Sequence, residues 1–134
     1  MSEIYKMLRR HEGVKHKVYT DSVGVQTIGV GRNLESKGLS DDEISWMLHN
    51  DVDECRHDLG YNFPWFIHLS EDRANAMLDM RFNLGATGFR KFKKMIAAME
   101  SKDYDKAAFE MLDSRWAEQV GKRAVELAEM VRVG

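Results

Sequence analysis

The feature that most constrains this chain is how few of its 134 residues can interrupt a helix. Pro64 is the only proline, and most of the glycines cluster at 24–31, 60, 85–88 and 121. Between those points apolar side chains recur every three or four residues, the spacing that places them on one face of a helix. Because proline and glycine commonly end helices, the chain from residue 40 onward is expected to be almost entirely helical.

The longest apolar stripe carries its own start signal. Ser40, followed three residues later by Glu43, is a capping box, and the stripe that it opens stops at Gly60. Ser70 is expected to cap a second helix that ends at Gly85. The connection between these two helices is apolar and predicted to hold a short helix packed on the core. Further helices are predicted at the following stretches: about 89–101, 104–113 and 117–132.

The N-terminal third has a different texture. An apolar stripe through Ile4 and Leu8 predicts a helix that ends before Gly13, and β-branched and aromatic residues around "DSVG" predict a hairpin over 17–30. The fold class is therefore α+β and mostly α-helical, with a small N-terminal β lobe on a helical body and a cleft between them. The prediction is one domain, 1–134, composed of a β lobe at about 14–35 and a body formed by 1–12 and 40–134.

Composition and charge exclude some function classes. The formal net charge is −2, and the acidic middle, with three Lys or Arg against ten acids over 38–88, is interpreted as solvated helix faces. Without a basic recognition helix, a DNA-binding regulator is disfavoured, and no nucleic-acid partner is expected. The first residues lack an apolar run long enough for a signal peptide or an anchor, so we expect no stable membrane insertion. Cys55, the single cysteine, is expected to be a buried structural thiol.

Two motif-like stretches near the N-terminus do not meet the requirements of the sites that they suggest. His11 and His16 are five residues apart with Gly13 between them, whereas two zinc-binding histidines on one helix face are four apart. "GVGR" at 29–32 lacks the third glycine and the strand–helix context of a phosphate loop. The sequence therefore predicts no metal site and no cofactor.

Two carboxyl groups in this region suit glycosidic bond cleavage better. Glu12 ends the first helix, where the negative end of the helix dipole disfavours a charge, which suits a general acid. Asp21 lies at the hairpin tip, and Thr27 follows on the returning strand. A protonated and an ionised carboxyl in unlike environments are what this reaction needs. The alternative left open by spacing alone is that Glu12 pairs with an arginine and Asp21 only caps a turn.

Glu12-Gly13, Asp21, Gly24 and "TIGVG" at 27–31 together resemble the active-site signature of the phage-type lysozymes, the family of the T-even bacteriophage enzymes. Later segments are similar to that family in the same order: "NDVD", "RFNLGATGF", "AAFEMLDSRW" and "QVGKRA". The resemblance covers nearly the whole chain. It implies a lysozyme-like fold with the active-site cleft between β lobe and body.

By position, the resemblance implies that Glu12 is the proton donor, Asp21 the second carboxylate and Thr27 the hydroxyl that helps to place water. It also implies substrate-binding roles for the following residues: Gly31, Arg32, Asn83 and Arg123. Arg123 matches an arginine that pairs with the catalytic glutamate. Asn83 matches a cleft amide, although a helix C-cap before Gly85 is an equally good interpretation.

Some positions depart from the family pattern. Arg32 stands where the T-even enzyme has a histidine, and we expect it to pair with Asp51. Ala86 replaces a cleft glutamate, so contact with the stem peptide is expected to differ. Only "NLESKG" separates the hairpin from the second helix, which implies a reduced small lobe.

The implied activity is that of an endolysin, a muramidase for host cell lysis that cleaves the β-1,4 bond between N-acetylmuramic acid and N-acetylglucosamine by acid–base catalysis with inversion. Its expected partner is bacterial peptidoglycan, and it is expected to act as a monomer that depends on a holin. With no signal peptide, it is expected to accumulate in the host cytoplasm before release to the cell wall. The alternatives are a lytic transglycosylase and a catalytically silent wall-binding module.

The tryptophans and methionines are interpreted mainly as core. Trp116 is expected to be buried with its indole N–H bonded, whereas Trp46 and Trp65 could also stack on a sugar or face a partner. The nine methionines, at helical spacing, are expected to fill the core.

Overall fold

The computed structural model describes residues 2–134, which form two compact units, 2–47 and 48–134. The boundary falls inside one helix, α2, which runs from Asp41 to Asn62. Residue 1, which the predicted single domain includes, lies outside the described residues. The α+β, mostly helical fold class is confirmed: seven α-helices accompany one small antiparallel sheet in the described chain.

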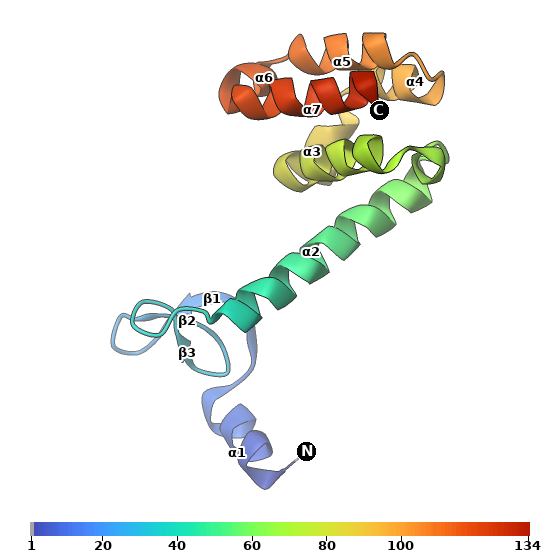
Figure 1. Cartoon of the computed structure of the whole chain (residues 1–134). Coiled ribbons are helices and arrows are strands. Elements are labelled where there is room, and N and C mark those ends of the chain that lie inside the picture. The colour runs from blue at the N-terminus through green and yellow to red at the C-terminus, as the bar shows by residue number, and fades with distance from the viewer. Residues whose placement is uncertain (1) are drawn as a thin grey trace. The chain divides into compact units, whose positions relative to one another are not determined.

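The N-terminal unit contains the helix and the hairpin that the sequence predicts. Helix α1 spans Glu3–Glu12 and ends at Gly13, whose φ of 78° is a conformation that favours glycine. Strands β1 (Lys15–Thr20), β2 (Gln26–Gly29) and β3 (Arg32–Asn33) follow as an antiparallel sheet in the order β1-β2-β3 (Figure 1). The short β3 is an element that the sequence does not predict.

The hairpin is bulged. Tyr19 faces Thr27 and Thr20 faces Gln26, but nearer the open end Lys15 faces Gly29, so β1 carries extra residues between Lys15 and Tyr19. A bulge of this kind changes the twist and the direction of a strand. The resulting register places the residues that follow β2 beside the link between α1 and β1.

Helix α2 begins with the predicted capping box. The Ser40 amide donates to Glu43 Oε1 at 2.8 Å, and the Glu43 amide donates to Ser40 Oγ at 3.2 Å. The helix runs through Gly60 to Asn62, two residues beyond the predicted end. Asn62 Nδ2 donates to the Asp58 carbonyl at 3.0 Å and to its Oδ1 at 2.8 Å, contacts that hold the last turn together.

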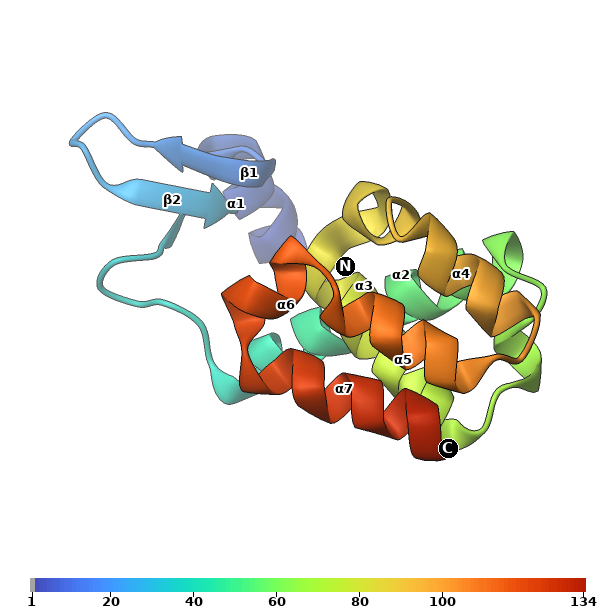
Figure 2. The same ribbon diagram turned by 90° about the horizontal axis from the view of Figure 1, so that it is seen from above.

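The C-terminal unit is a bundle of helices that follow α2. They are the 3₁₀ helix η1 (Phe66–His68), α3 (Glu71–Arg90), α4 (Lys93–Glu100), α5 (Tyr104–Leu112), α6 (Arg115–Val120) and α7 (Lys122–Val133). Ser70 Oγ accepts from the Arg73 amide, as its predicted capping role requires. Figures 1 and 2 show α5 and α7 lying side by side.

Two glycines divide this bundle more finely than predicted. The prediction that the helix after Ser70 ends at Gly85 is right about the break, since Gly85 has φ 78°, but helical turns resume and run to Arg90. The prediction of a single helix over 117–132 is wrong. Gly121, with φ 58°, separates α6 from α7, because a residue in that conformation cannot continue a right-handed helix.

The prediction that the methionines fill the core is right for the C-terminal unit and wrong for Met7 and Met47, which are exposed. Five methionines of the C-terminal unit have no exposed surface: Met77, Met80, Met95, Met99 and Met111. Cys55 is buried as expected, and burial raises the pKa of its thiol. Across residues 2–134, no helix combines the length and apolar character needed to cross a bilayer.

One acidic residue of α2 does not fit the interpretation of this region as solvated helix faces. The Asp58 side chain is only 15% exposed, and it is bound by two arginines of α3. Arg81 Nε donates to Oδ2 at 2.7 Å, and Arg90 Nη2 donates to Oδ1 at 2.6 Å. These bonds connect the last turns of α2 to both sides of the Gly85 break in α3, and the Arg90 bonds hold the pKa of Asp58 well below its usual range.

Candidate functional site

Glu12 lies at the last position of α1 and is exposed. Its side chain runs directly beneath Gly31, in the turn between β2 and β3. A Cβ built on Gly31 would lie 2.7 Å from Glu12 Oε2 and 3.0 Å from Cδ. The hairpin register explains this approach. Lys15 faces Gly29, so continuing the register by two residues places Gly13, which follows Glu12, beside Gly31. The structure therefore brings together the predicted proton donor and a predicted substrate-binding residue.

Asp21 occupies the start of the hairpin turn, and the turn fixes its carboxyl group. Oδ1 accepts from the Val23 amide at 3.0 Å and from the Val25 amide at 2.8 Å. Among the described residues no donor is bonded to Oδ2. Asp21 thus does cap the turn, as the structural alternative proposes, but the cap uses one oxygen and leaves the other available to a ligand or a water molecule.

Thr27 is buried in β2, with 4% of its surface exposed. Its hydroxyl donates to the Val25 carbonyl at 2.9 Å, and the same carbonyl accepts from the Asp21 amide at 2.9 Å. Val25 therefore ties Thr27 and Asp21 to one peptide unit. Since the single hydroxyl proton is already donated, Thr27 Oγ1 can only accept from a further partner.

Arg32 lies in β3 and binds an acidic residue that the sequence does not assign to it, Glu43. Arg32 Nη1 donates to Glu43 Oε1 at 2.8 Å, and Nη2 donates to Glu43 Oε2. Nη1 also donates to the Gly38 carbonyl. The short loop after the hairpin brings the capping glutamate of α2 to the guanidinium, and this pairing lowers the pKa of Glu43 to about 2. Asp51 belongs to the C-terminal unit, and its expected pairing with Arg32 stays a prediction.

Asn83 is in α3, two residues before the Gly85 break. Its Oδ1 accepts from Trp116 Nε1 at 2.8 Å, and the Trp116 ring is 5% exposed. The expectation that Trp116 is a core residue with a bonded N–H is therefore confirmed. The Asn83 side chain is exposed, and its amide nitrogen is the end that could meet a substrate.

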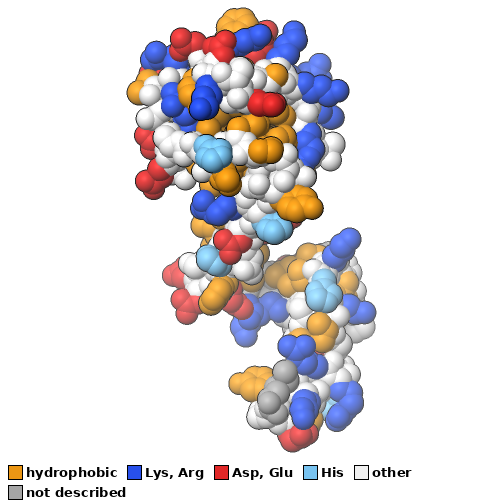
Figure 3. All heavy atoms as spheres, turned by 90° about the vertical axis from the view of Figure 1, so that its right-hand side faces the viewer, with side chains coloured by type: hydrophobic (Ala, Val, Ile, Leu, Met, Phe, Trp, Pro, Cys, Tyr) orange, Lys and Arg blue, Asp and Glu red, His pale blue; other side chains and the backbone are white. Residues whose placement is uncertain are grey.

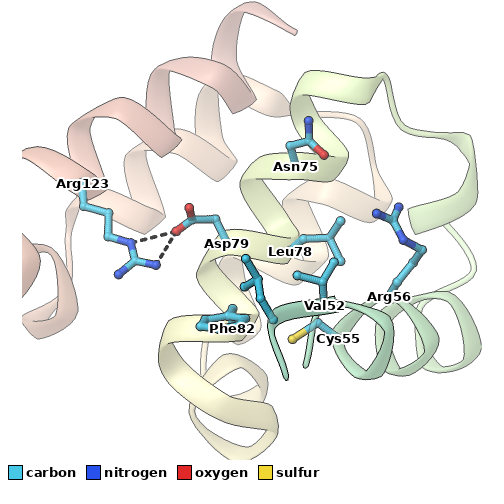
Figure 4. Close-up of a pocket in the computed structure, with 9 residues that line it drawn as sticks. Val52, Cys55, Arg56, Asn75, Leu78, Asp79, Phe82 and Arg123 are labelled. Carbon is cyan, nitrogen blue, oxygen red and sulfur yellow. Dashed lines mark hydrogen bonds and ion pairs between the residues drawn. The ribbon is translucent and has the colours of Figure 1, made fainter. Parts of the chain in front are cut away.

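Arg123 lies near the start of α7 and binds an acid that the sequence analysis missed. Both Nε and Nη2 approach Asp79 Oδ1 at 2.8 Å. Figure 4 shows this pair at one side of a pocket of about 380 Å³ formed by side chains of α2, α3 and α7 within the C-terminal unit. A signal for Asp79 did exist: it is a lone acid in the apolar run "AMLDM" at 76–80.

The predicted site residues are distributed over both units. Glu12, Asp21, Thr27, Gly31 and Arg32 belong to the N-terminal unit, and Asn83 and Arg123 to the C-terminal one. The predicted pairing of Arg123 with the catalytic glutamate stays a prediction. The surface of the C-terminal unit seen in Figure 3 carries Lys, Arg, Asp and Glu side chains together with apolar ones. Among residues 2–134 no three His, Cys, Asp or Glu side chains lie close enough together to hold a metal ion.

Comparison with known proteins gives a consistent result. The family model described as phage lysozyme matches residues 9–132. The chain is 26% identical over 157 residues to the pre-baseplate central spike protein Gp5 of Enterobacteria phage T4, an alignment that covers 96% of this chain and 27% of that protein. It is 24% identical to the probable T4-type lysozyme 2 of Dictyostelium discoideum, covering 100% of this chain and 96% of that protein.

The family match extends over both units, from the end of α1 to the last turn of α7. It includes all seven predicted site residues. The expected resemblance is therefore confirmed: the chain belongs to the phage lysozyme family and is a glycoside hydrolase that degrades peptidoglycan.

Proposed function

We propose that this lysozyme cleaves the β-1,4 bond between N-acetylmuramic acid and N-acetylglucosamine by a single displacement with inversion. Glu12 gives its proton to the glycosidic oxygen that leaves with N-acetylglucosamine. A water molecule attacks the anomeric carbon of N-acetylmuramic acid from the opposite face, and Asp21 takes the proton that this water loses. Inverting enzymes work with such a pair of carboxyl groups and a water between one of them and the sugar.

The hairpin geometry is the observation that carries this proposal. Asp21 Oδ1 is occupied by two backbone amides, so Oδ2 remains as an acceptor. Thr27 Oγ1 has donated its proton to Val25 and is a second acceptor held by the same peptide unit. A water that donates one proton to each oxygen would keep a lone pair for the anomeric carbon. This use of both protons distinguishes a water-activating site from a simple turn cap.

The products of digestion test the proposal. Purified peptidoglycan is digested, and the fragments are analysed by mass spectrometry and by NMR from the first minutes. Because the substrate bond is β, inversion gives an α-anomer at the new reducing end, which is N-acetylmuramic acid. A β-anomer as the first product would contradict inversion, and 1,6-anhydromuramyl ends would show a lytic transglycosylase. The absence of any cleavage would favour the wall-binding alternative.

Substitution of Thr27 tests the water-placing role. Thr27→Val has nearly the same shape and removes the acceptor oxygen, so we expect kcat to fall on the order of tenfold to hundredfold with little change in KM, since the lost contact acts on the attacking water. Thr27→Ser keeps a hydroxyl and is the matched control, expected to retain most of the activity. Steady-state hydrolysis of a soluble peptidoglycan fragment measures both constants. Equal activity of the two variants would contradict the role.

We further propose a role in host cell lysis. The enzyme would accumulate in the host cytoplasm and reach the wall after a holin has opened the inner membrane. Membership of the phage lysozyme family and the resemblance to the T-even enzymes support this role. The similarity to a central spike protein supports a second possibility, a wall-degrading enzyme carried by a phage tail, in which case the activity would be the same but the delivery would differ.

A further inference from the structure

The Glu12 side chain lies close against Gly31 in the N-terminal unit. A Cβ at residue 31 would lie 2.7 Å from Glu12 Oε2, 3.0 Å from Cδ and 3.2 Å from Cγ. The contact thus involves the carboxyl group itself, together with the methylene that carries it. At these distances there is no space for a methyl group on residue 31 unless the Glu12 carboxyl moves.

The backbone conformation next to Glu12 and at Gly31 brings these two residues together. Gly13 ends α1 with φ 78°, directly after Glu12, and Gly31 turns the chain from β2 into β3 with φ 66°. Between them the sheet register sets Lys15 against Gly29. The carboxyl therefore lies against the β2–β3 turn.

We infer that Gly31 is a positioning residue for the proton donor. Its bare α-carbon is the surface on which the Glu12 carboxyl rests, and this contact limits the rotamers that the otherwise exposed side chain can occupy. The inference rests on the proposed function, since it assigns Gly31 a role through Glu12. It differs from the role of a substrate-binding glycine, which would act on KM.

Conformation alone offers a competing explanation for a glycine here, because φ near +66° is unfavourable for other residues. Gly29 separates the two explanations. It has φ 69° in the same hairpin, yet a Cβ built on it meets no atom within 4 Å. Gly29→Ala therefore introduces nearly the same backbone strain as Gly31→Ala without touching Glu12.

The experiment compares Gly31→Ala with Gly29→Ala in the full chain. Glu12 is exposed, so in Gly31→Ala its carboxyl can turn away from the added methyl group into solvent, and both variants should fold with similar melting temperatures. Gly31→Ala should nevertheless lower kcat by about 100-fold, the scale expected when a catalytic group is displaced by about 1 Å. KM should stay within about twofold, and Gly29→Ala should remain within about threefold of the native kcat.

A second pair of variants tests whether the effect acts through Glu12. In Glu12→Asp the carboxyl is one methylene shorter and withdraws from residue 31, so adding Gly31→Ala should then cost less than about threefold. A full 100-fold loss in the Glu12→Asp background, or equal losses for Gly31→Ala and Gly29→Ala, would overturn the inference. The proposed function fails separately, if Glu12→Gln keeps native activity.

Discussion

Glu12→Gln is expected to lower kcat for peptidoglycan hydrolysis by about 1,000-fold, within the range that general acid catalysis contributes. Glutamine has nearly the same size and can rest against Gly31 as glutamate does, but it has no acidic proton for the leaving oxygen. The contact with Gly31 involves the end of the side chain and places no charge partner against it. We therefore expect the fold to persist and KM to change little. Turbidity loss of permeabilised Gram-negative cells and hydrolysis of soluble fragments both measure the effect.

Glu3→Gln is the matched control for this substitution. Glu3 is in the same helix, and its exposed carboxylate forms an i,i+3 pair with Lys6 at 3.6 Å. The change removes one negative charge from α1 but no group of the proposed site, so activity should stay near the native level. If Glu12→Gln and Glu3→Gln were equally active, the assignment of the proton donor would be wrong.

The parts of the fold that follow from local chemistry could be predicted from the sequence. The capping box at Ser40 and Glu43 and the cap at Ser70 depend on residues three apart, and both are present. The hairpin around "DSVG" depends on turn residues and β-branched neighbours, and it too is present. Such signals act over a few residues, so they can be recognised without knowing how distant segments pack.

Long-range polar contacts could not be predicted in the same way. Asp79 binds Arg123 across 44 residues of sequence, and Trp116 binds Asn83 across 33. Periodicity shows which face of a helix is apolar, but it does not show which helix covers that face. For the same reason the sequence does not indicate that Arg32 binds Glu43, because the path of the short loop decides which acid the guanidinium meets.

Only part of the site can be predicted from the sequence, because the backbone contacts that hold it depend on the folded chain. The signature indicates which residues act, and the resemblance supplies their roles, but neither shows how the backbone holds them. The link from Asp21 through Val25 to Thr27 consists of main-chain groups that any residue at position 25 other than proline could supply. The contact between Glu12 and Gly31 likewise depends on the bulge that sets the register of the hairpin.

Asp58 makes the interaction with the largest expected effect on stability. Its carboxylate accepts from Arg81, Arg90 and Asn62, while Arg81 is 8% exposed and also donates to Cys55 Sγ at 3.6 Å. Removing the acid would leave the Arg81 guanidinium buried beside an unoccupied space. Breaking a buried pair in this way costs much more than losing a surface pair, because the remaining charge is no longer compensated.

The pH dependence of the stabilisation by Asp58 follows from the direction in which folding shifts its pKa. The bonds from Arg90 and Arg81 lower the pKa of Asp58 in the folded state, whereas in the unfolded chain it has an ordinary value of about 3.9. A lowered folded pKa means that the unfolded state binds a proton more readily. The stabilisation is therefore fully present above the unfolded pKa and is lost progressively as the pH falls below it.

Asp58→Ala is accordingly expected to lower the free energy of unfolding by about 3 kcal/mol at pH 7. Urea denaturation followed by circular dichroism measures the change, and the difference between variant and native chain should shrink as the pH falls from 5 to 2. Asp53→Ala, which removes an exposed acid from the same helix, serves as control and should change stability by less than about 1 kcal/mol at pH 7. Equal effects of the two substitutions would mean that the arginines of α3 find other partners. A difference that persists unchanged at pH 2 would mean that the carboxylate charge contributes nothing.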